Sequence, residues 1–185
     1  MSRDYGIGNR EFLYERESIL AADFASILKQ YNGLLSRVAA GYEANEALRQ
    51  ELLQEIAVAV WQGLQRFEHK SSLKTYILKI AHNRAVTHVA SNARLPRTDE
   101  LDENTEHGVS ALLNPEDATA QDKQLQALLS VVRTLPLPGR QVLTLSLEGL
   151  SYGEIADVCG ITTSHAGVLL KRTKEEVVRR LNHDE

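Results

Sequence analysis

The chain has 185 residues, of which 43% are hydrophobic and 5% aromatic, and its formal net charge is −4. Length and apolar fraction suffice for one or two compact domains. The single cysteine excludes an internal disulfide, no Cys/His cluster has zinc-site spacing, and no apolar stretch is long enough to cross a bilayer.

Three amphipathic segments make up the first half of the chain. Apolar residues recur at steps of three and four from Phe24 to Val38, from Leu48 to Leu64 and from Leu73 to Val89. In a helix this spacing forms one stripe that faces a core. Gly41 is expected to end the first helix. The three segments together predict a small helical bundle, with Trp61, Tyr76 and Ile80 in its core.

The helical pattern is interrupted between Ser91 and Ala120. From Thr98 to Gln121 there are seven acidic residues and no Lys or Arg. This composition offers little apolar surface to offset the entropy of ordering, so we expect an extended linker. A plain flexible spacer and a tether with a role of its own both fit it.

Helical periodicity resumes at Leu125. A Leu-Pro-Leu-Pro-Gly stretch at 135–139 precedes three further predicted helices, at Arg140–Leu147, Tyr152–Cys159 and Thr163–Leu181. Ser151 is the expected N-cap of the second of these, with Glu154 as its reciprocal capping partner. Leu, Ala, Val, Glu and Gln are plentiful throughout, so the predicted fold class is all-α.

The last two segments have the features of a helix-turn-helix. Such a motif needs a small residue where the helices cross, a turn residue that tolerates positive φ, and apolar residues that lock the pair. Ala156 supplies the first and Gly160 the second. The residues expected to lock the motif are Ile155, Cys159, Ile161, Ala166 and Leu170.

The second helix of that motif is expected to enter the DNA major groove. Its N-terminal turn would face base edges, and its basic residues would reach phosphates. The candidate residues for base edges are Thr163, Ser164, His165 and Gly167. The candidates for phosphates are Lys171, Arg172 and Lys174. An exposed histidine without a DNA contact is an equally good interpretation of His165.

Basic residues are concentrated just before the acidic run. Between Trp61 and Arg97 there are seven basic residues against Glu68 alone. This asymmetry suggests a basic working surface beside an acidic tether, although ordinary solvated helix faces would explain it as well.

Two separate stretches carry a resemblance to a known family. In the first half they are Glu51-Leu-Leu-Gln-Glu55, Trp61, Phe67 and the sequence KTYILKIAHN at 74–83. In the second half they are LPLPGR at 135–140 and LSYGEIA at 150–156. Over nearly its whole length the chain resembles the extracytoplasmic-function (ECF) sigma factors, RNA polymerase sigma subunits of the sigma-70 family.

The resemblance implies a domain organisation. An N-terminal extension at 1–20 would precede a region 2 bundle at 21–95. An acidic linker at 96–122 would lead to region 4 at 123–185, a helix-turn-helix without a wing. The protein would be a non-enzymatic subunit that directs core RNA polymerase to promoters and assists DNA melting.

Residue roles also follow from the resemblance. A face of the second helix would dock on the clamp coiled coil of the polymerase's largest subunit, through Glu51, Leu52, Gln54 and Glu55. The minus-ten element, with its melted non-template strand, would be held by Phe67, His69, Lys70, Ser71, Lys74, Lys79, His82, Asn83 and Arg84. The minus-thirty-five element would be bound by Ser151 and Tyr152 together with the seven residues of the second motif helix given above.

Some positions depart from the family pattern. The family usually has a Ser-Arg pair after a valine in the recognition helix, where this chain has Ala166 to Leu169. The departure implies a missing DNA contact. Tyr76 stands where tryptophan is frequent, and His82 where arginine often precedes the asparagine; neither change threatens the fold.

Two other functions compete with this interpretation of the sequence. A sigma-like regulator could bind DNA or an anti-sigma factor without supporting initiation. An enzyme finds little support, because there is no phosphate-binding glycine loop, no framed carboxylate pair and no nucleophile with an evident base. The implied partners are core RNA polymerase, duplex promoter DNA and an anti-sigma factor. No cofactor, metal or membrane insertion is expected, and the bacterial cytoplasm is the expected location.

Overall fold

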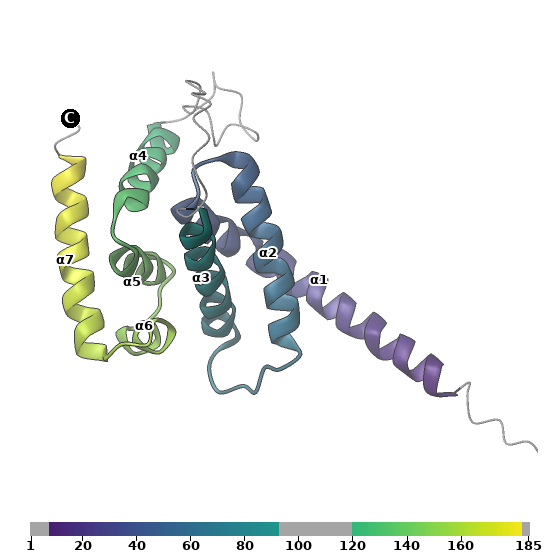
Figure 1. Cartoon of the computed structure of the whole chain (residues 1–185). Helices are drawn as coiled ribbons and strands as arrows, with labels where there is room; N and C mark the ends of the chain where they lie inside the picture. Colours follow the sequence, from purple (N-terminus) through teal and green to yellow (C-terminus); the bar gives the residue numbers. More distant parts are fainter. Residues whose placement is uncertain (1–7, 93–119, 183–185) are drawn as a thin grey trace, which may run out of the picture. The chain divides into compact units, whose positions relative to one another are not determined.

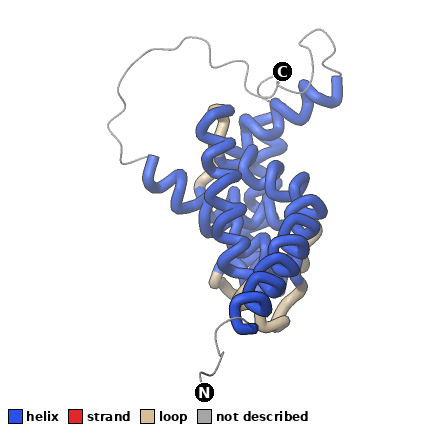
Figure 2. The backbone as a smooth tube through the Cα atoms, turned by 90° about the vertical axis from the view of Figure 1, so that its right-hand side faces the viewer, coloured by secondary structure: helices blue, strands red, loops and turns tan. Residues whose placement is uncertain are grey.

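The computed structural model describes the backbone of residues 8–92 and 120–182, and side chains within 24–92 and 123–182. Every regular element in these ranges is a helix, which confirms the predicted all-α class (Figure 1). Short loops join them within each described range (Figure 2). The helices are α1 (Gly8–Tyr42), α2 (Glu46–Leu64), α3 (Leu73–Asn92), α4 (Ala120–Thr134), α5 (Leu137–Leu147), α6 (Tyr152–Cys159) and α7 (Thr163–Leu181).

The chain divides into two units, Met1–Gly33 and Leu34–Glu185. The described part of the first unit is the beginning of α1, which starts at Gly8 and so runs through most of the predicted extension at 1–20. The second unit holds the end of α1 and all the other helices. Helix α3, which lies before the predicted linker at 96–122, contacts α5 and α6, which lie after it. Packing within the second unit therefore does not mark the predicted domain boundaries, which stay a prediction.

The end of α1 packs through the residues that the apolar pattern selects. Leu35, Val38 and Ala39 are buried, as are Leu52, Ile56 and Val60 along one face of α2. The helix ends at Tyr42, one residue beyond the predicted stop at Gly41.

The helices α2 and α3 pack closely where α2 ends. A Cβ added at Gly63 would clash with Ile80 Cδ1, so the Ile80 side chain would have to move to admit a larger residue there. The Tyr76 hydroxyl donates a hydrogen bond to the Gly63 carbonyl at 3.0 Å. Ile80, Tyr76 and Trp61 are half-buried, less than the core position predicted for them.

The second half folds as the pattern predicts, with small shifts of boundary. Helix α5 begins at Leu137, three residues before the predicted start, because proline is tolerated in the first turn of a helix and Pro138 lies there. Its inner face is formed by Val142, Leu143 and Leu145. Helix α4 begins at Ala120, inside the predicted linker. Most of that linker lies outside the described residues.

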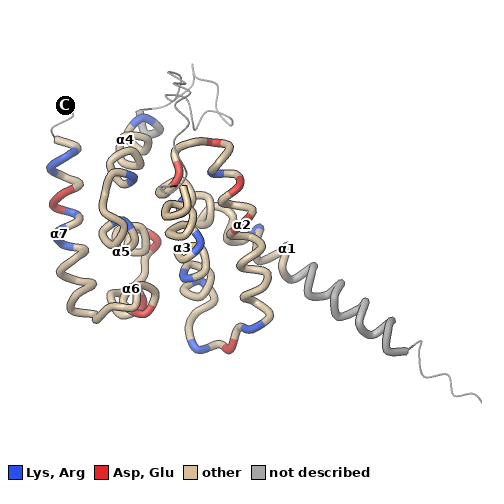
Figure 3. Tube along the Cα trace, in the orientation of Figure 1, with Lys and Arg blue, Asp and Glu red and all other residues tan. Residues whose placement is uncertain are grey.

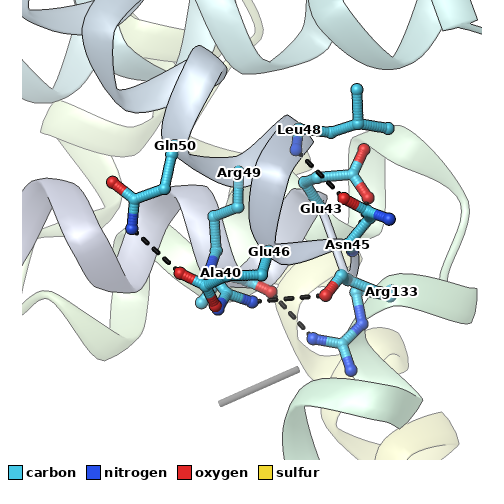
Figure 4. Close-up of polar contacts among 9 residues, drawn as sticks. Ala40, Glu43, Asn45, Glu46, Leu48, Arg49, Gln50 and Arg133 are labelled. Atoms are coloured by element: carbon cyan, nitrogen blue, oxygen red, sulfur yellow. Dashed lines mark hydrogen bonds and ion pairs between the residues drawn. The ribbon is translucent and has the colours of Figure 1, made fainter. Parts of the chain in front are cut away.

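A polar contact joins α4 to the end of α1. Arg133 donates a hydrogen bond from Nη1 to the Ala40 carbonyl at 3.0 Å (Figure 4). Nearby, the Asn45 side chain caps α2 by accepting from the Leu48 amide at 3.1 Å, and the first-turn Glu46 pairs with Arg49. Burial lowers the pKa of Arg133, with the charge of Arg49 as a second cause.

Candidate nucleic-acid interface

Helices α6 and α7 form the predicted helix-turn-helix with the predicted bounds. Ser151 and Glu154 make a full capping box: the Glu154 amide donates to Ser151 Oγ at 3.3 Å, and the Ser151 amide donates to Glu154 Oε2 at 2.9 Å. Gly160 ends α6 with φ 67°, in the left-handed region that favours glycine. The local sequence therefore sets where α6 starts and where the chain turns.

The lock between these helices is mostly as predicted. Ile155 and Ala166 are fully buried, and Leu170 is 2% exposed. Cys159 and Ile161 are only half-buried, because they lie at the turn rather than between the helices. The expectation that Cys159 sits in the packed interior was wrong in degree. Its partial burial still raises the pKa of the thiol.

The N-terminal turn of α7 presents the residues predicted to face base edges. Thr162 caps the helix, accepting from the His165 amide at 3.2 Å. Thr163, Ser164 and His165 are exposed, and Gly167 leaves open space around its Cα. Small polar groups at an exposed helix N-terminus suit contact with base edges and phosphates.

Basic residues continue along α7, and two more candidates lie at the start of α6. Lys171, Arg172 and Lys174 are all exposed. Ser151 and Tyr152 are exposed as well, with Tyr152 at 53%. The structure thus places the predicted minus-thirty-five residues on the surface of one motif, except that Gly167 is half-buried.

The second predicted DNA-contact surface is the loop between α2 and α3. Its exposed residues include His69, Lys70 and Ser71. The Phe67 ring lies between two others, with ring centroids 4.5 Å from His69 and 4.7 Å from Tyr76. The loop therefore offers aromatic faces beside basic and hydroxyl groups, the combination that holds unstacked bases.

Helix α3 continues this surface with basic and amide groups. Lys79 and Asn83 are exposed and Arg84 is half-buried. Basic positions mark α3, the loop before it carries both signs, and acidic positions are prominent in the first part of α2 (Figure 3). Lys74 is different, because its ammonium group donates to the Glu148 carbonyl at the C-terminal end of α5.

The prediction that His82 belongs to the minus-ten surface was wrong, because the residue lies in the core. Its side chain is fully buried, and Nδ1 shares a 2.9 Å hydrogen bond with the Tyr42 hydroxyl. Within the described chain Nε2 has no hydrogen-bond partner, so a charged ring would leave a buried donor unsatisfied. Burial lowers the pKa of His82 to about 3. The spacing Leu78, His82, Ala85 follows the buried face of α3 and could have revealed this.

Most of the residues predicted to dock on polymerase lie on the exposed side of α2. Glu51, Gln54 and Glu55 are exposed. Leu52 is fully buried and cannot touch a partner, because it lies on the core stripe with Ile56. The prediction missed Val58, which is 57% exposed and one heptad after Glu51, on the same side of the helix.

Comparison with known proteins agrees with this arrangement. The model of Sigma-70 region 2 matches residues 27–95, and that of Sigma-70 region 4 matches residues 125–177. The RNA polymerase sigma-H factor of Pseudomonas aeruginosa is 31% identical over 149 residues, covering 76% of this chain and 75% of that relative. The ECF RNA polymerase sigma-E factor of Escherichia coli K12 is 28% identical over 131 residues, covering 66% and 69%.

The chain belongs to the ECF sigma factors of the sigma-70 family. This sigma factor therefore acts in transcription initiation by RNA polymerase, in a family of non-enzymatic initiation factors.

Solved structures support the fold of this sigma factor. The sigma factor RpoE in complex with the anti-sigma factor NepR from Bartonella quintana has a TM-score of 0.67 at 21% identity, covering 88% of this chain and 99% of that one. CnrH in complex with the cytosolic domain of CnrY has a TM-score of 0.63 at 18% identity, covering 90% and 97%. No helix among the described residues combines the length and apolarity that a membrane span requires.

Proposed function

We propose that this sigma factor recognises the promoter through two surfaces and docks on polymerase through a third. The start of α7 binds the minus-thirty-five element, and the α2–α3 loop with α3 holds the melted minus-ten element. The observation that carries the proposal is the helix-turn-helix, whose N-terminal turn exposes Thr163, Ser164 and His165 ahead of the basic Lys171 and Arg172.

The docking surface in this proposal is the exposed side of α2. Glu51, Gln54 and Glu55 offer two carboxylates and an amide to a basic partner surface, and Val58 adds exposed apolar area beside them. Protein interfaces commonly combine apolar groups with polar groups around them.

The proposal extends to regulation and location. One of the similar solved structures is the complex of a sigma factor with an anti-sigma factor, which supports an anti-sigma partner for this chain. A factor of this kind works where the polymerase and the chromosome are, in the bacterial cytoplasm. It carries out no chemical step itself and serves the catalysis of its partner.

A reconstituted transcription assay tests the division of labour. Core RNA polymerase with the full chain is expected to give discrete transcripts from cognate upstream DNA. Lys171→Ala is expected to lower promoter affinity and to reduce the salt dependence by about one unit of slope, because one phosphate contact is lost. Glu55→Ala is expected to weaken core binding and leave the salt slope for DNA unchanged.

The matched control is Lys123→Ala, which removes an exposed lysine outside the proposed DNA surfaces. Its salt slope should equal that of the wild type. Core binding without any specific transcript would contradict the proposal and favour a sigma-like regulator. The same defect in the Lys171 and Glu55 variants would contradict the division of labour.

A further inference from the structure

A bidentate ion pair joins the end of α1 to the C-terminal end of α5. Arg37 Nε lies 2.7 Å from Glu148 Oε1, and Arg37 Nη2 lies 2.8 Å from Glu148 Oε2. The two residues are separated by 111 positions in the sequence. The Glu148 side chain is only 8% exposed, whereas that of Arg37 is 62% exposed. The contact with Glu148 raises the pKa of Arg37.

Two residues at the start of α3 are engaged at the same place. The Lys74 ammonium donates to the Glu148 carbonyl, and the Thr75 hydroxyl donates to Glu154 Oε1 at 2.7 Å. Glu154 is also the capping-box residue of α6, so the start of the helix-turn-helix lies directly against the start of α3. Lys74 belongs to the proposed minus-ten surface, and here its charged group is already occupied.

Further contacts hold the same two parts together. Arg133 of α4 donates to the Ala40 carbonyl, as Figure 4 shows. The Arg140 guanidinium carbon lies 5.4 Å from the centre of the Tyr42 ring, within the range of a cation–π contact. Region 2 and region 4 are therefore joined by charged and polar contacts that involve five helices, α1 and α3 on one side and α4, α5 and α6 on the other.

This arrangement conflicts with the binding of both promoter elements. Elements named for positions minus ten and minus thirty-five are about 25 base pairs apart, or about 80 Å of B-form DNA. In the structure Thr75 and Glu154, beside the two DNA surfaces, are within hydrogen-bond distance. The two regions must separate before both elements can be bound.

We propose that the Arg37–Glu148 pair is a latch that holds regions 2 and 4 in a closed, DNA-incompetent arrangement, with Lys74 masked until core polymerase binding opens it. The DNA-binding part of this inference rests on the proposed function. The latch is suited to opening, because Arg37 is largely solvated, and water and salt weaken its attraction to Glu148. Glu148 is nearly buried, so loss of its partner disfavours the closed state strongly.

The test measures the distance between the regions directly. Spin labels are placed at Ala90→Cys in α3 and Val178→Cys in α7, both exposed positions, in a full chain that also carries Cys159→Ala. Pulsed dipolar spectroscopy gives the distance distribution. Arg37→Glu and Glu148→Arg are each expected to raise the ratio of open to closed chains about tenfold. The double charge swap is expected to restore the closed distribution.

Arg179→Glu is the matched control. Arg179 has 65% side-chain exposure and also pairs with a glutamate, but that pair lies within α7. Its distance distribution should equal that of the wild type. Unchanged distances in both single variants would overturn the latch, and so would a double swap that stays open.

A second arm adds core RNA polymerase to the labelled wild-type chain. A shift to long distances is expected on binding, and a bound chain that keeps the short distance would overturn the proposal. The variants without polymerase test the latch independently of transcription. If they behave as expected while core polymerase fails to bind, the proposed function fails and the latch stands as a contact between two domains.

Discussion

The two proposed DNA surfaces each contain a residue in the left-handed backbone region, but the residues differ. In the helix-turn-helix it is Gly160, with φ 67°, where glycine adopts the conformation without strain. In the α2–α3 loop it is His69, with φ 56°. A histidine there costs about 1 kcal/mol relative to glycine. A non-glycine residue that bears such a cost points to a use for its side chain, and the ring of His69 does lie against Phe67.

The interiors behind these two surfaces also differ, because one is apolar and the other contains buried polar groups. Ile155, Ala166 and Leu170 make an apolar lock behind the recognition helix. Behind α3, the buried groups include His82 and the Tyr42 hydroxyl, and burial raises the pKa of that hydroxyl. Region 4 therefore depends on packing and caps, whereas region 2 also depends on polar groups kept uncharged by burial.

Acid should destabilise the interior of region 2 more than that of region 4, and this is the largest of the expected effects. Because the folded-state pKa of His82 is about 3 and the unfolded value about 6.5, the unfolded chain takes up the proton first. The contribution of the neutral His82 ring to the free energy of unfolding is fully present above pH 6.5 and is lost as the pH falls toward 3. Between pH 7 and pH 4 it removes about 3 kcal/mol from the free energy of unfolding.

Urea unfolding of the full chain at several pH values measures this loss. His82→Gln should have a flatter pH dependence across that window, because the amide does not titrate. Asn83→Gln, at an exposed position of the same helix and without a titrating group, should keep the wild-type dependence. Equal pH profiles for the His82 variant and the wild type would show that His82 does not titrate as its burial requires.

A pair of glycine substitutions compares the turn of the motif with its recognition helix. Gly160→Ala should lower the free energy of unfolding by about 1 to 2 kcal/mol, because alanine is strained at positive φ. Gly167→Ala should raise it by about 0.5 to 1 kcal/mol, because the position is helical and a Cβ there meets nothing within 4 Å. Chemical denaturation of both variants checks the two signs, and a shared sign would break the comparison.

The smallest expected effect is at the loop. His69→Gly should change the free energy of unfolding by under about 1 kcal/mol, since relief of strain offsets the loss of the ring contact. Opening of a promoter by the reconstituted polymerase, followed by permanganate reactivity of melted thymines, should nevertheless decrease. His69→Asn removes the ring without the added flexibility of glycine, because asparagine also tolerates the left-handed region, and so separates the two effects. Normal opening by the His69 variant would leave its strained backbone without a functional reason.

The helix-turn-helix was the most predictable part of the molecule, because its signals are local. Ser151, Glu154 and Gly160 lie within ten residues and together specify a helix start and a turn. The error at Leu52 had a different origin: the motif named it for docking, whereas its spacing with Ile56 and Val60 already placed it in the core. Motif resemblance selects a face of a helix, and only the helical periodicity says which of its residues reach the surface.

Other features had no signal in the sequence. Arg37 and Glu148 are ordinary charged residues in separate halves of the chain, and nothing local to either pairs them. The left-handed conformation of His69 is set by how the loop closes between α2 and α3, which residue type does not specify. Contacts between distant segments depend on the assembled packing, so the latch could be found only in three dimensions.

The contact of Lys74 with the Glu148 carbonyl affects how the free chain meets the rest of the chromosome. A genome offers about a million or more non-specific sites for each promoter, and every available cation strengthens attachment to all of them. A lysine already held by its own protein adds nothing to that background. In the proposed closed state the factor can therefore reach polymerase before random DNA sequesters it, and its full affinity for nucleic acid is expected only after assembly.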